Sequence, residues 1–151
     1  MTVLFLCTGN TCRSPMAAAL LRAELDKRGG HDIMVESAGV CASGGPASPL
    51  ALAVMRERGL NLAAHRSTQA GPEHFRRAGL VVAMSRSHGA AAAAMGADPT
   101  RLLTWDIPDP FGGSLETYRR IRDMLQEKTT VLAETLLSQY KEGDQSTWTN
   151  T

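Results

Sequence analysis

The feature that most constrains the fold is a series of short apolar runs that alternate with helix-like segments. Residues 3–7 (VLFLC) and 78–85 (AGLVVAMS) are apolar almost throughout and lack the polar alternation of a strand with one face in water. Strands of this kind are typical of parallel sheets whose two faces are covered by helices. Residues 32–40 and 101–105 complete a set of four expected strands. The pattern predicts an α/β fold with an open, parallel four-stranded sheet and helices on both faces.

Helix signals fall between and after these runs. The segments predicted as helices are 16–28, 48–59, 85–96 and 114–140. Ser14 and Pro15 are typical of an N-cap and a first helical turn, and the glycine pair 29–30 would stop the first helix. Ser85 and Ser87 are alternative caps for the third helix.

Length, charge and cysteine content limit the class of protein. The chain has 151 residues, enough for a single domain, which we expect over residues 1–140 with a polar tail at 141–151. The net charge is +1, so we expect neither nucleic acid nor a membrane as a partner. The apolar start, residues 1–7, is too short for a membrane span and lacks the features of a signal peptide. Three cysteines, an odd number, predict reduced thiols and a cytoplasmic location.

The segment CTGNTCRSP, residues 7–15, joins the first expected strand to the first expected helix. A loop in this position turns its backbone N–H groups inward and can hold an anion. Gly9 permits close approach of the backbone, Asn10 tolerates a left-handed conformation, and Arg13 can grip phosphate oxygens in pairs. Cys7 would lie under this cradle, where the helix N-terminus, the amides and Arg13 would lower the pKa of its thiol. The loop therefore combines a nucleophile with a holder for a phosphoryl group.

A second unusual loop, residues 106–113 (DIPDPFGG), follows the last expected strand. Ligands of open parallel sheets bind beyond the carboxyl ends of the strands. We therefore expect the loops 7–14 and 106–113 to open at the same edge of the sheet.

Other interpretations of the first loop remain open at this point. A cysteine at a strand end is commonly a small core residue. A nucleotide-binding loop would need Gly-Lys-Ser/Thr, and this loop contains no lysine. A zinc half-site formed by Cys7 and Cys12 would need a second ligand pair, but Cys41 stands alone and the four histidines are scattered. We therefore expect no metal.

The segments VLFLCTGNTCRSPMAAALL, ESAGV and DPFGGSLETYRRIRD resemble the low-molecular-weight protein tyrosine phosphatase family over about residues 3–137. The resemblance implies the Rossmann-like fold of that family and a two-step mechanism without metal or cofactor. Cys7 would attack phosphorus and form a phosphocysteine, while Arg13 and the loop amides hold the equatorial oxygens. Asp109 would protonate the leaving group and then activate water. Asp106 competes for that role, but only Asp109 precedes Pro-Phe.

The resemblance also implies supporting roles around the loop. Ser14 should donate a hydrogen bond that keeps Cys7 ionised. Asn10 should brace the loop through side-chain hydrogen bonds to Ser37 and to a histidine, expected to be His65. The residues expected to bind substrate are Thr8, Gly9, Asn10, Thr11, Cys12, Ser14 and Phe111.

Cys12 and the remaining histidines lead to two further expectations. Thiols at the two ends of a tightly curled loop can approach bonding distance, so Cys7 and Cys12 are expected to form a reversible disulfide. Peroxide would then inactivate the enzyme, and a thiol reductant would restore it. His31, His74 and His88 are expected on solvated faces.

Thr11 bears on the choice of substrate. Family members that act on phosphotyrosine typically carry a bulky aliphatic residue there, and their acid loop commonly reads Asp-Pro-Tyr. Thr11 together with DPFGGS resembles the bacterial protein-arginine phosphatases. A threonine leaves more room and offers a hydroxyl to a guanidinium group or to the attacking water. We therefore expect phosphorylated proteins as partners, phosphoarginine in preference to phosphotyrosine, and phosphate ion as a product.

Two other functions are less consistent with the sequence. An arsenate reductase on this fold needs further redox cysteines, and none follows Cys41. An inactive phosphoresidue-binding module would be expected to lack Cys7 or Asp109, and both are present.

Overall fold

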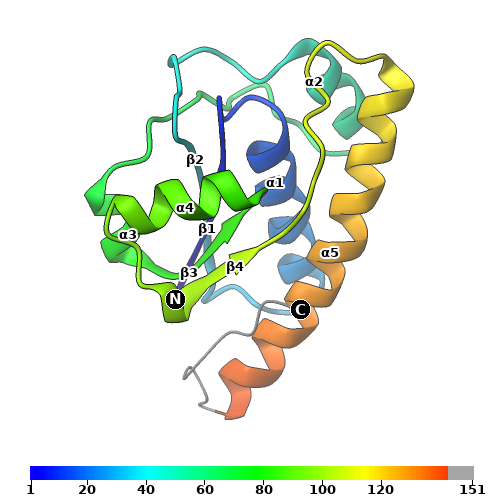
Figure 1. Ribbon diagram of the computed structural model, residues 1–151. Helices are drawn as coiled ribbons and strands as arrows, with labels where there is room; N and C mark the ends of the chain where they lie inside the picture. The colour runs from blue at the N-terminus through cyan, green and yellow to red at the C-terminus, as the bar shows by residue number, and fades with distance from the viewer. Residues whose placement is uncertain (143–151) are drawn as a thin grey trace.

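Four parallel strands form a single sheet in the computed structural model, which describes residues 1–142 (Figure 1). The strands are β1 (Thr2–Cys7), β2 (Met34–Gly39), β3 (Ala78–Ala83) and β4 (Leu102–Thr104). Their order across the sheet is β2-β1-β3-β4, which confirms the predicted open parallel sheet. Apart from its first two residues, the expected tail 141–151 lies outside the described residues.

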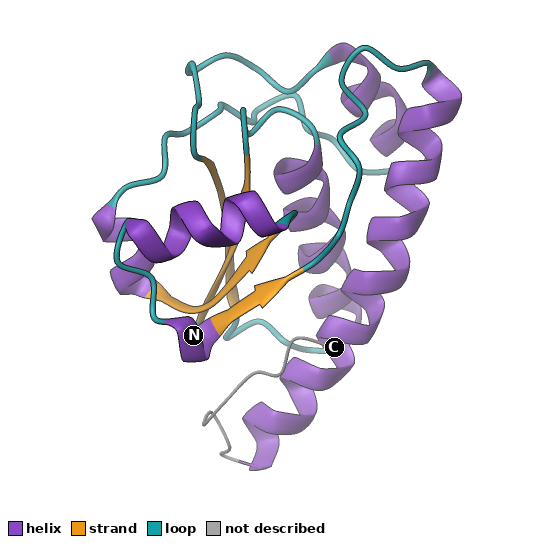
Figure 2. Cartoon of the chain, viewed as in Figure 1, coloured by secondary structure: helices purple, strands orange, loops and turns teal. Residues whose placement is uncertain are grey.

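Helices cover both faces of this sheet (Figure 2). They are α1 (Arg13–Lys27), α2 (Pro49–Arg56), α3 (Pro72–Arg77), α4 (Arg86–Ala94) and α5 (Leu115–Glu142). Val3 and Phe5 of β1 pack with side chains of α1, α2 and α5, whereas Leu4 and Leu6 pack with side chains of α3 and α4. The uninterrupted apolar run of β1 is thus explained by two separate cores. Within residues 1–142, no helix is long and apolar enough to cross a membrane.

Helix α1 begins earlier than its capping signal predicts. The N-cap position belongs to Cys12, which makes no side-chain capping bond, and Arg13 and Ser14 are already helical. The prediction of Ser14 as the N-cap is therefore wrong. The Ser14 hydroxyl instead contacts the sulfur of Cys7 and the side-chain amide of Asn10, so it serves the loop and not the helix end.

The sequence does not predict α3 (Pro72–Arg77). It has only six residues, too few to show an apolar period, although Gly71-Pro72 is a typical helix start. The cap of α4 is Ser85, whose side chain accepts a hydrogen bond from the backbone N–H of His88. This contact decides between the two caps that the sequence allows.

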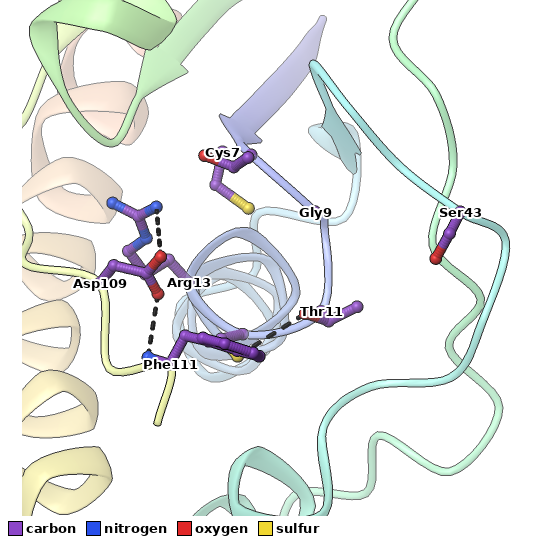
Figure 3. A pocket seen from close by; sticks show the side chains of 9 residues that line it. Cys7, Gly9, Thr11, Arg13, Ser43, Asp109 and Phe111 are labelled. Atoms are coloured by element: carbon purple, nitrogen blue, oxygen red, sulfur yellow. Dashed lines mark hydrogen bonds and ion pairs between the residues drawn. The ribbon is translucent and has the colours of Figure 1, made fainter. Parts of the chain in front are cut away.

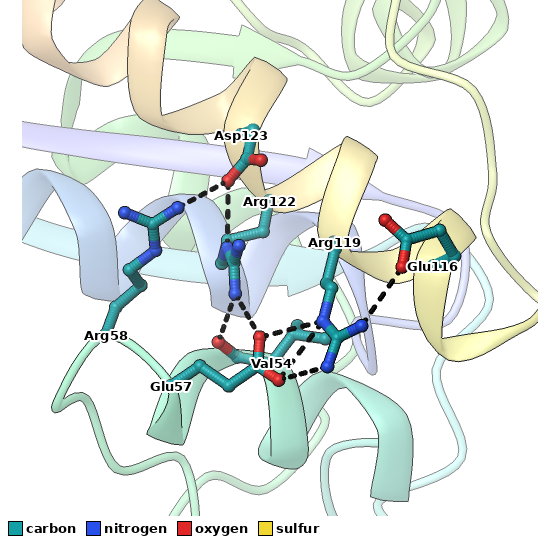
Figure 4. Close-up of polar contacts among 7 residues, drawn as sticks. All are labelled: Val54, Glu57, Arg58, Glu116, Arg119, Arg122 and Asp123. Carbon is teal, nitrogen blue, oxygen red and sulfur yellow. Dashed lines mark hydrogen bonds and ion pairs between the residues drawn. The ribbon is translucent and has the colours of Figure 1, made fainter.

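A group of ion pairs joins the C-terminal end of α2 to α5 (Figure 4). Glu57 follows α2 directly and accepts from Arg119 at 2.7 Å and from Arg122 at 2.6 Å. Asp123 accepts from Arg58 at 3.0 Å and from Arg122 at 3.0 Å. These contacts hold the C-terminal end of α2 against α5.

Candidate active site

A pocket of about 410 Å³ lies at the carboxyl ends of the strands (Figure 3). It is lined by Cys7, Thr8, Gly9, Thr11, Cys12, Arg13, Ser43, Asp109 and Phe111. The loops 7–14 and 106–113 therefore do open at the same edge, as the order of strands and helices predicts. Ser43 was not identified from the sequence. It lies in the segment of small residues that follows β2. Because ligands of parallel sheets bind beyond the strand ends, that place in the sequence could have indicated it.

Cys7 ends β1 and is 3% exposed. Its sulfur lies 2.8 Å from the hydroxyl oxygen of Ser14. That oxygen accepts a hydrogen bond from the side-chain amide of Asn10 at 2.7 Å, which leaves the one hydroxyl hydrogen of Ser14 to be donated to the sulfur. The contact expected between Ser14 and the nucleophile is therefore present.

The charge state of Cys7 depends on opposing effects. Burial raises the pKa of the Cys7 thiol above its usual range, because removal from water disfavours the thiolate. The hydroxyl and backbone N–H of Ser14, the backbone N–H of Asn10 and the charge of Arg13 lower that pKa. The groups expected to acidify Cys7 are in place, but burial outweighs them. The expectation of a net lowered pKa is thus corrected.

Arg13 and Asp109 lie next to each other at the pocket (Figure 3). Arg13 is 6% exposed, and its Nη1 donates to the backbone oxygen of Ile107 at 3.0 Å. Its Nη2 lies 3.7 Å from Oδ2 of Asp109, whose side chain is 53% exposed. Asp109 Oδ1 also accepts from the backbone N–H of Phe111 at 3.0 Å. Asp106 lines a different pocket, so Asp109 is the carboxylate placed beside Arg13 and Cys7.

Asn10 is the main brace of the loop. It is fully buried and adopts a φ of 57°, the left-handed conformation that asparagine tolerates. Its side-chain nitrogen donates to Ser14 and, at 3.0 Å, to Ser37, as expected. The expected side-chain bond to His65 is not formed: the His65 Nε2–H donates to the backbone oxygen of Asn10 at 2.7 Å. The side-chain oxygen of Asn10 accepts instead from the backbone N–H of Thr68 at 2.9 Å, because the segment after His65 lies alongside the loop.

Gly39, which ends β2, is a glycine that the packing of the loop requires. A Cβ at Gly39 would lie 2.5 Å from the backbone oxygen of Thr8 and 3.0 Å from the backbone nitrogen of Asn10. A Cβ at Gly9 would come no closer than 3.7 Å to the side chain of Thr11. The backbone of the loop therefore packs closely against Gly39, and the approach of Gly9 to a bound anion stays a prediction. Gly39 is the glycine of the ESAGV segment.

Cys12 lies among hydroxyl groups under the pocket. Its sulfur is 3.3 Å from Ser48 Oγ and 3.4 Å from Tyr118 Oη. Burial, reinforced by Cys12, raises the pKa of Tyr118 to about 12, so its hydroxyl stays protonated at neutral pH. Cys7 and Cys12 are both free thiols in this structure.

Thr11 and Phe111 occupy the pocket wall and rim. The hydroxyl oxygen of Thr11 lies 3.7 Å from the sulfur of Cys12, and its backbone oxygen accepts from the N–H of Ser48 at 3.0 Å. The ring of Phe111 is 81% exposed and available to a ligand. Asp109 is the one acidic residue among those that line this pocket.

The expectation for His88 is wrong. His31 is exposed and His74 is half-buried, but His88 is only 4% exposed. It is buried because the first turn of α4 packs on the sheet beneath the loop, where its Nε2 lies 2.7 Å from Thr8 Oγ1 and its Nδ1 lies 2.8 Å from Ser85 Oγ.

Known proteins share both the sequence and this fold. A family model for the low molecular weight phosphotyrosine protein phosphatases matches residues 2–142. A protein-arginine-phosphatase of Geobacillus stearothermophilus is 43% identical over 145 residues, which cover 89% of this chain and 95% of that protein. A low molecular weight protein-tyrosine-phosphatase of Streptomyces coelicolor is 34% identical over 148 residues, which cover 86% of this chain and 90% of that protein.

The structural comparison agrees with these matches. A solved structure of the YwlE arginine phosphatase, a C7S mutant with a phosphorylated active site serine, matches with a TM-score of 0.85 and 38% identity. The match covers 91% of this chain and 96% of that one. The resemblance inferred from the motifs is confirmed, and so is its closeness to the arginine phosphatase branch. This chain belongs to the low molecular weight phosphotyrosine protein phosphatase family.

Proposed function

We propose that this protein hydrolyses phosphoarginine in proteins through a phosphocysteine intermediate on Cys7. The observation that carries the proposal is a single pocket that brings Cys7, Arg13 and Asp109 together with Thr11 on its wall. The similarity to proteins named protein-arginine-phosphatase supports the choice of substrate.

The first step transfers the phosphoryl group to sulfur. The Cys7 thiolate attacks phosphorus, the S–P bond forms and the P–N bond of phosphoarginine breaks. The Asp109 carboxyl gives its proton to the departing guanidine nitrogen. Arg13 and the backbone N–H groups of the loop stabilise the charge on the equatorial oxygens. The position of Asp109, beside Arg13 and half-exposed, supports this role because its carboxyl can exchange protons with water.

The second step releases phosphate. A water molecule attacks phosphorus and gives a proton to the Asp109 carboxylate, the P–S bond breaks, and inorganic phosphate leaves. The Cys7 thiolate is regenerated, and the Ser14 hydroxyl hydrogen bond stabilises it as a leaving group. Asp109 returns to its protonated form, so one carboxyl serves as acid and then as base.

Thr11 and Asp109 support a guanidinium substrate. A short, hydroxyl-bearing side chain at the wall leaves room for the planar guanidinium and can accept a hydrogen bond from it. The Asp109 carboxyl would accept a hydrogen bond from that group through its carbonyl oxygen and donate its proton to the departing nitrogen.

Phosphotyrosine is the second candidate substrate, and Phe111 is the observation that favours it. An aromatic ring that is 81% exposed at the rim can stack on a phenyl ring. The family also contains relatives named protein-tyrosine-phosphatase.

The deciding experiment compares the kcat/KM values for phosphoarginine and phosphotyrosine peptides of identical flanking sequence. We expect the wild type to prefer phosphoarginine and Thr11→Ile to reduce or reverse that preference, because the larger apolar wall disfavours guanidinium. Thr11→Ser, which keeps the hydroxyl, is the matched control and should retain the preference. A wild-type preference for phosphotyrosine, or a preference unchanged in Thr11→Ile, contradicts the proposal.

A simpler measurement separates an enzyme from a phosphoresidue-binding module. We expect turnover of p-nitrophenyl phosphate in buffer containing a chelator, and its loss in Cys7→Ser. The absence of turnover in the wild type would favour a binding module.

A further inference from the structure

His88 is a buried polar side chain beside the pocket that the two-step mechanism does not use. It lies in the first turn of α4, outside both loops, and is 4% exposed. Its Nε2 lies 2.7 Å from the hydroxyl oxygen of Thr8, which lines the pocket. His88 therefore connects the residue next to the nucleophile to a separate element of the fold.

The position of His88 is set by its own helix. Ser85 caps α4 and lies 2.8 Å from the Nδ1 of His88, and its oxygen also lies 2.9 Å from that of Ser87. At Gly89, an added Cβ would lie 3.1 Å from the side-chain oxygen of Thr104, so the first turn of α4 approaches β4 closely. These contacts fix the position of α4 and the orientation of the imidazole.

The imidazole is neutral at physiological pH. Burial lowers the pKa of His88, and the positive charge of Arg13 lowers it further, against a smaller opposite effect of Asp109. A neutral imidazole has one N–H donor and one acceptor nitrogen. The hydrogen bonds from Ser87 to Thr8 can therefore run in only two directions.

The two directions differ at the pocket. If Nδ1 carries the hydrogen, Nε2 accepts from Thr8, and the Thr8 hydroxyl has no hydrogen left for a ligand. If Nε2 carries it, the chain of donors runs from Ser87 to Ser85 to His88 to Thr8. The Thr8 hydroxyl hydrogen is then free for an oxygen in the pocket. An anionic phosphoryl group favours this second direction, because it accepts strong hydrogen bonds.

We infer that His88 is a positioning residue, which donates from Nε2 to Thr8 and so directs the Thr8 hydroxyl hydrogen to the bound phosphoryl group or phosphate ion. The inference rests on the proposed phosphatase function and adds a binding contact to it. A hydrogen bond from a neutral hydroxyl to a charged acceptor typically changes affinity by about tenfold or more.

Three substitutions at His88 separate the contributions of its two ring nitrogens, Nε2 and Nδ1. Gln can place a donor near the position of Nε2 and keep the contact with Thr8. Asn is shorter and can reach only Ser85, and Leu removes both contacts. The Thr8 hydroxyl remains in His88→Leu and His88→Asn but is no longer directed, so only part of that hydrogen bond's effect should be lost. We expect the inhibition constant of inorganic phosphate, measured against p-nitrophenyl phosphate, to rise about fivefold to tenfold in both variants. In His88→Gln it should stay within about twofold of the wild type.

A double-mutant cycle with Thr8→Val tests the route of the effect. If His88 acts through the Thr8 hydroxyl, His88→Leu adds little to the loss already present in Thr8→Val. His31→Gln, on an exposed histidine, is the control and should leave the constant unchanged. Thermal melting of each variant identifies any that fails to fold, and the Asn and Gln pair then carries the test.

Two outcomes would overturn the inference: an unchanged phosphate constant in folded His88→Asn, or losses that simply add in the double variant. A merely structural role would lower the melting temperature without the difference between Gln and Asn. If the wild type lacks phosphatase activity, the proposed function fails. Calorimetric titration with inorganic phosphate then tests the His88 inference separately. The expected phosphate affinities are again similar in the wild type and His88→Gln, and lower in His88→Asn and His88→Leu.

Discussion

At the residue scale, two effects of opposite sign act on the pKa of the Cys7 thiol. Burial raises the pKa of its thiol, and the hydrogen bonds of the loop and the charge of Arg13 lower it. A thiolate is the nucleophilic form of cysteine, so each hydrogen bond to the sulfur contributes directly to the reactive fraction. Ser14 is the closest of these groups, at 2.8 Å.

Ser14→Ala should therefore raise the pKa of Cys7 further. The measurement is the rate of Cys7 alkylation by iodoacetamide as a function of pH, followed by mass spectrometry. We expect the midpoint to move to higher pH by about one unit, because the thiolate loses a hydrogen bond. Ser43→Ala, on another pocket residue, is the matched control. An unchanged midpoint in Ser14→Ala would show that the hydroxyl does not act on the sulfur.

Asp109→Asn should reduce kcat for a phosphoarginine peptide by about 10²- to 10⁴-fold, the usual effect of removing a general acid. The loss for p-nitrophenyl phosphate should be smaller, since p-nitrophenolate leaves without a proton. Asp106→Asn provides the control, because Asp106 lines a different pocket, and its kcat should stay within about twofold. Equal losses of kcat in Asp109→Asn and Asp106→Asn would contradict the assignment of Asp109 as the general acid.

Cys12 is expected to protect Cys7 from irreversible oxidation. Peroxide would oxidise Cys7 to a sulfenic acid, and the Cys12 thiol would displace water from it to form a disulfide. Wild-type activity should return almost fully with dithiothreitol after peroxide treatment, and Cys12→Ser should recover much less. The activities of both proteins before and after reduction provide the measurement. Equal recovery would contradict the role of Cys12.

At the element scale, the end of β2 supports the phosphate-binding loop through backbone contact. Gly39→Ala would place a methyl group 2.5 Å from the backbone oxygen of Thr8. Overpacking against backbone typically lowers the free energy of unfolding by about 1–3 kcal/mol. We expect this loss in urea denaturation, together with weaker inhibition by phosphate.

Gly45→Ala is the matched control for Gly39→Ala, since an added Cβ at Gly45 meets nothing within 4 Å. Its unfolding midpoint should stay close to that of the wild type. If Gly39→Ala were as stable and as strongly inhibited by phosphate as the wild type, the close contact between β2 and the loop would have no energetic consequence.

At the scale of the whole molecule, the ion pairs between α2 and α5 predict how stability depends on pH. Hydrogen bonds from Arg119 and Arg122 lower the pKa of Glu57 to about 2 from an ordinary value near 4.5. A carboxyl with a lowered folded-state pKa stabilises the fold above its unfolded-state value, and the contribution disappears as pH falls toward the folded value. The relevant window is therefore about pH 4.5 to 2.

Glu57→Gln should make the melting temperature less dependent on pH within that window. The size of the effect is small because the pair is partly exposed and screened by solvent. Calorimetric melting of the wild type and the variant between pH 5 and 2 measures it. Glu116→Gln serves as control, because this more exposed carboxylate pairs, within residues 1–142, with Arg119 and with no second arginine. Parallel curves for the wild type and Glu57→Gln would contradict the assignment.

Most of the fold was predictable, since its signals are local. The apolar runs at 3–7 and 78–85 match β1 and β3 closely, and the long apolar period after 114 matches α5. The short helix α3 was not predictable, because six residues are too few to show an apolar period. The start of α1 was not predictable either, because Ser14, which resembles a helix cap, contacts the side chains of the loop instead. Local patterns cannot distinguish a serine that caps a helix from one that contacts a nucleophile.

The sequence by itself determined the parallel α/β architecture and a loop that joins β1 to α1 with Cys7 and Arg13 at its two ends, because both features are encoded in adjacent residues. Only the tertiary structure decided the rest of the site. His88 meets Thr8 across 80 positions of the chain, and Thr68 meets Asn10 across 58. Such contacts depend on how the sheet brings strand ends together, and so does the burial that raises the pKa of Cys7. No local pattern carries that information.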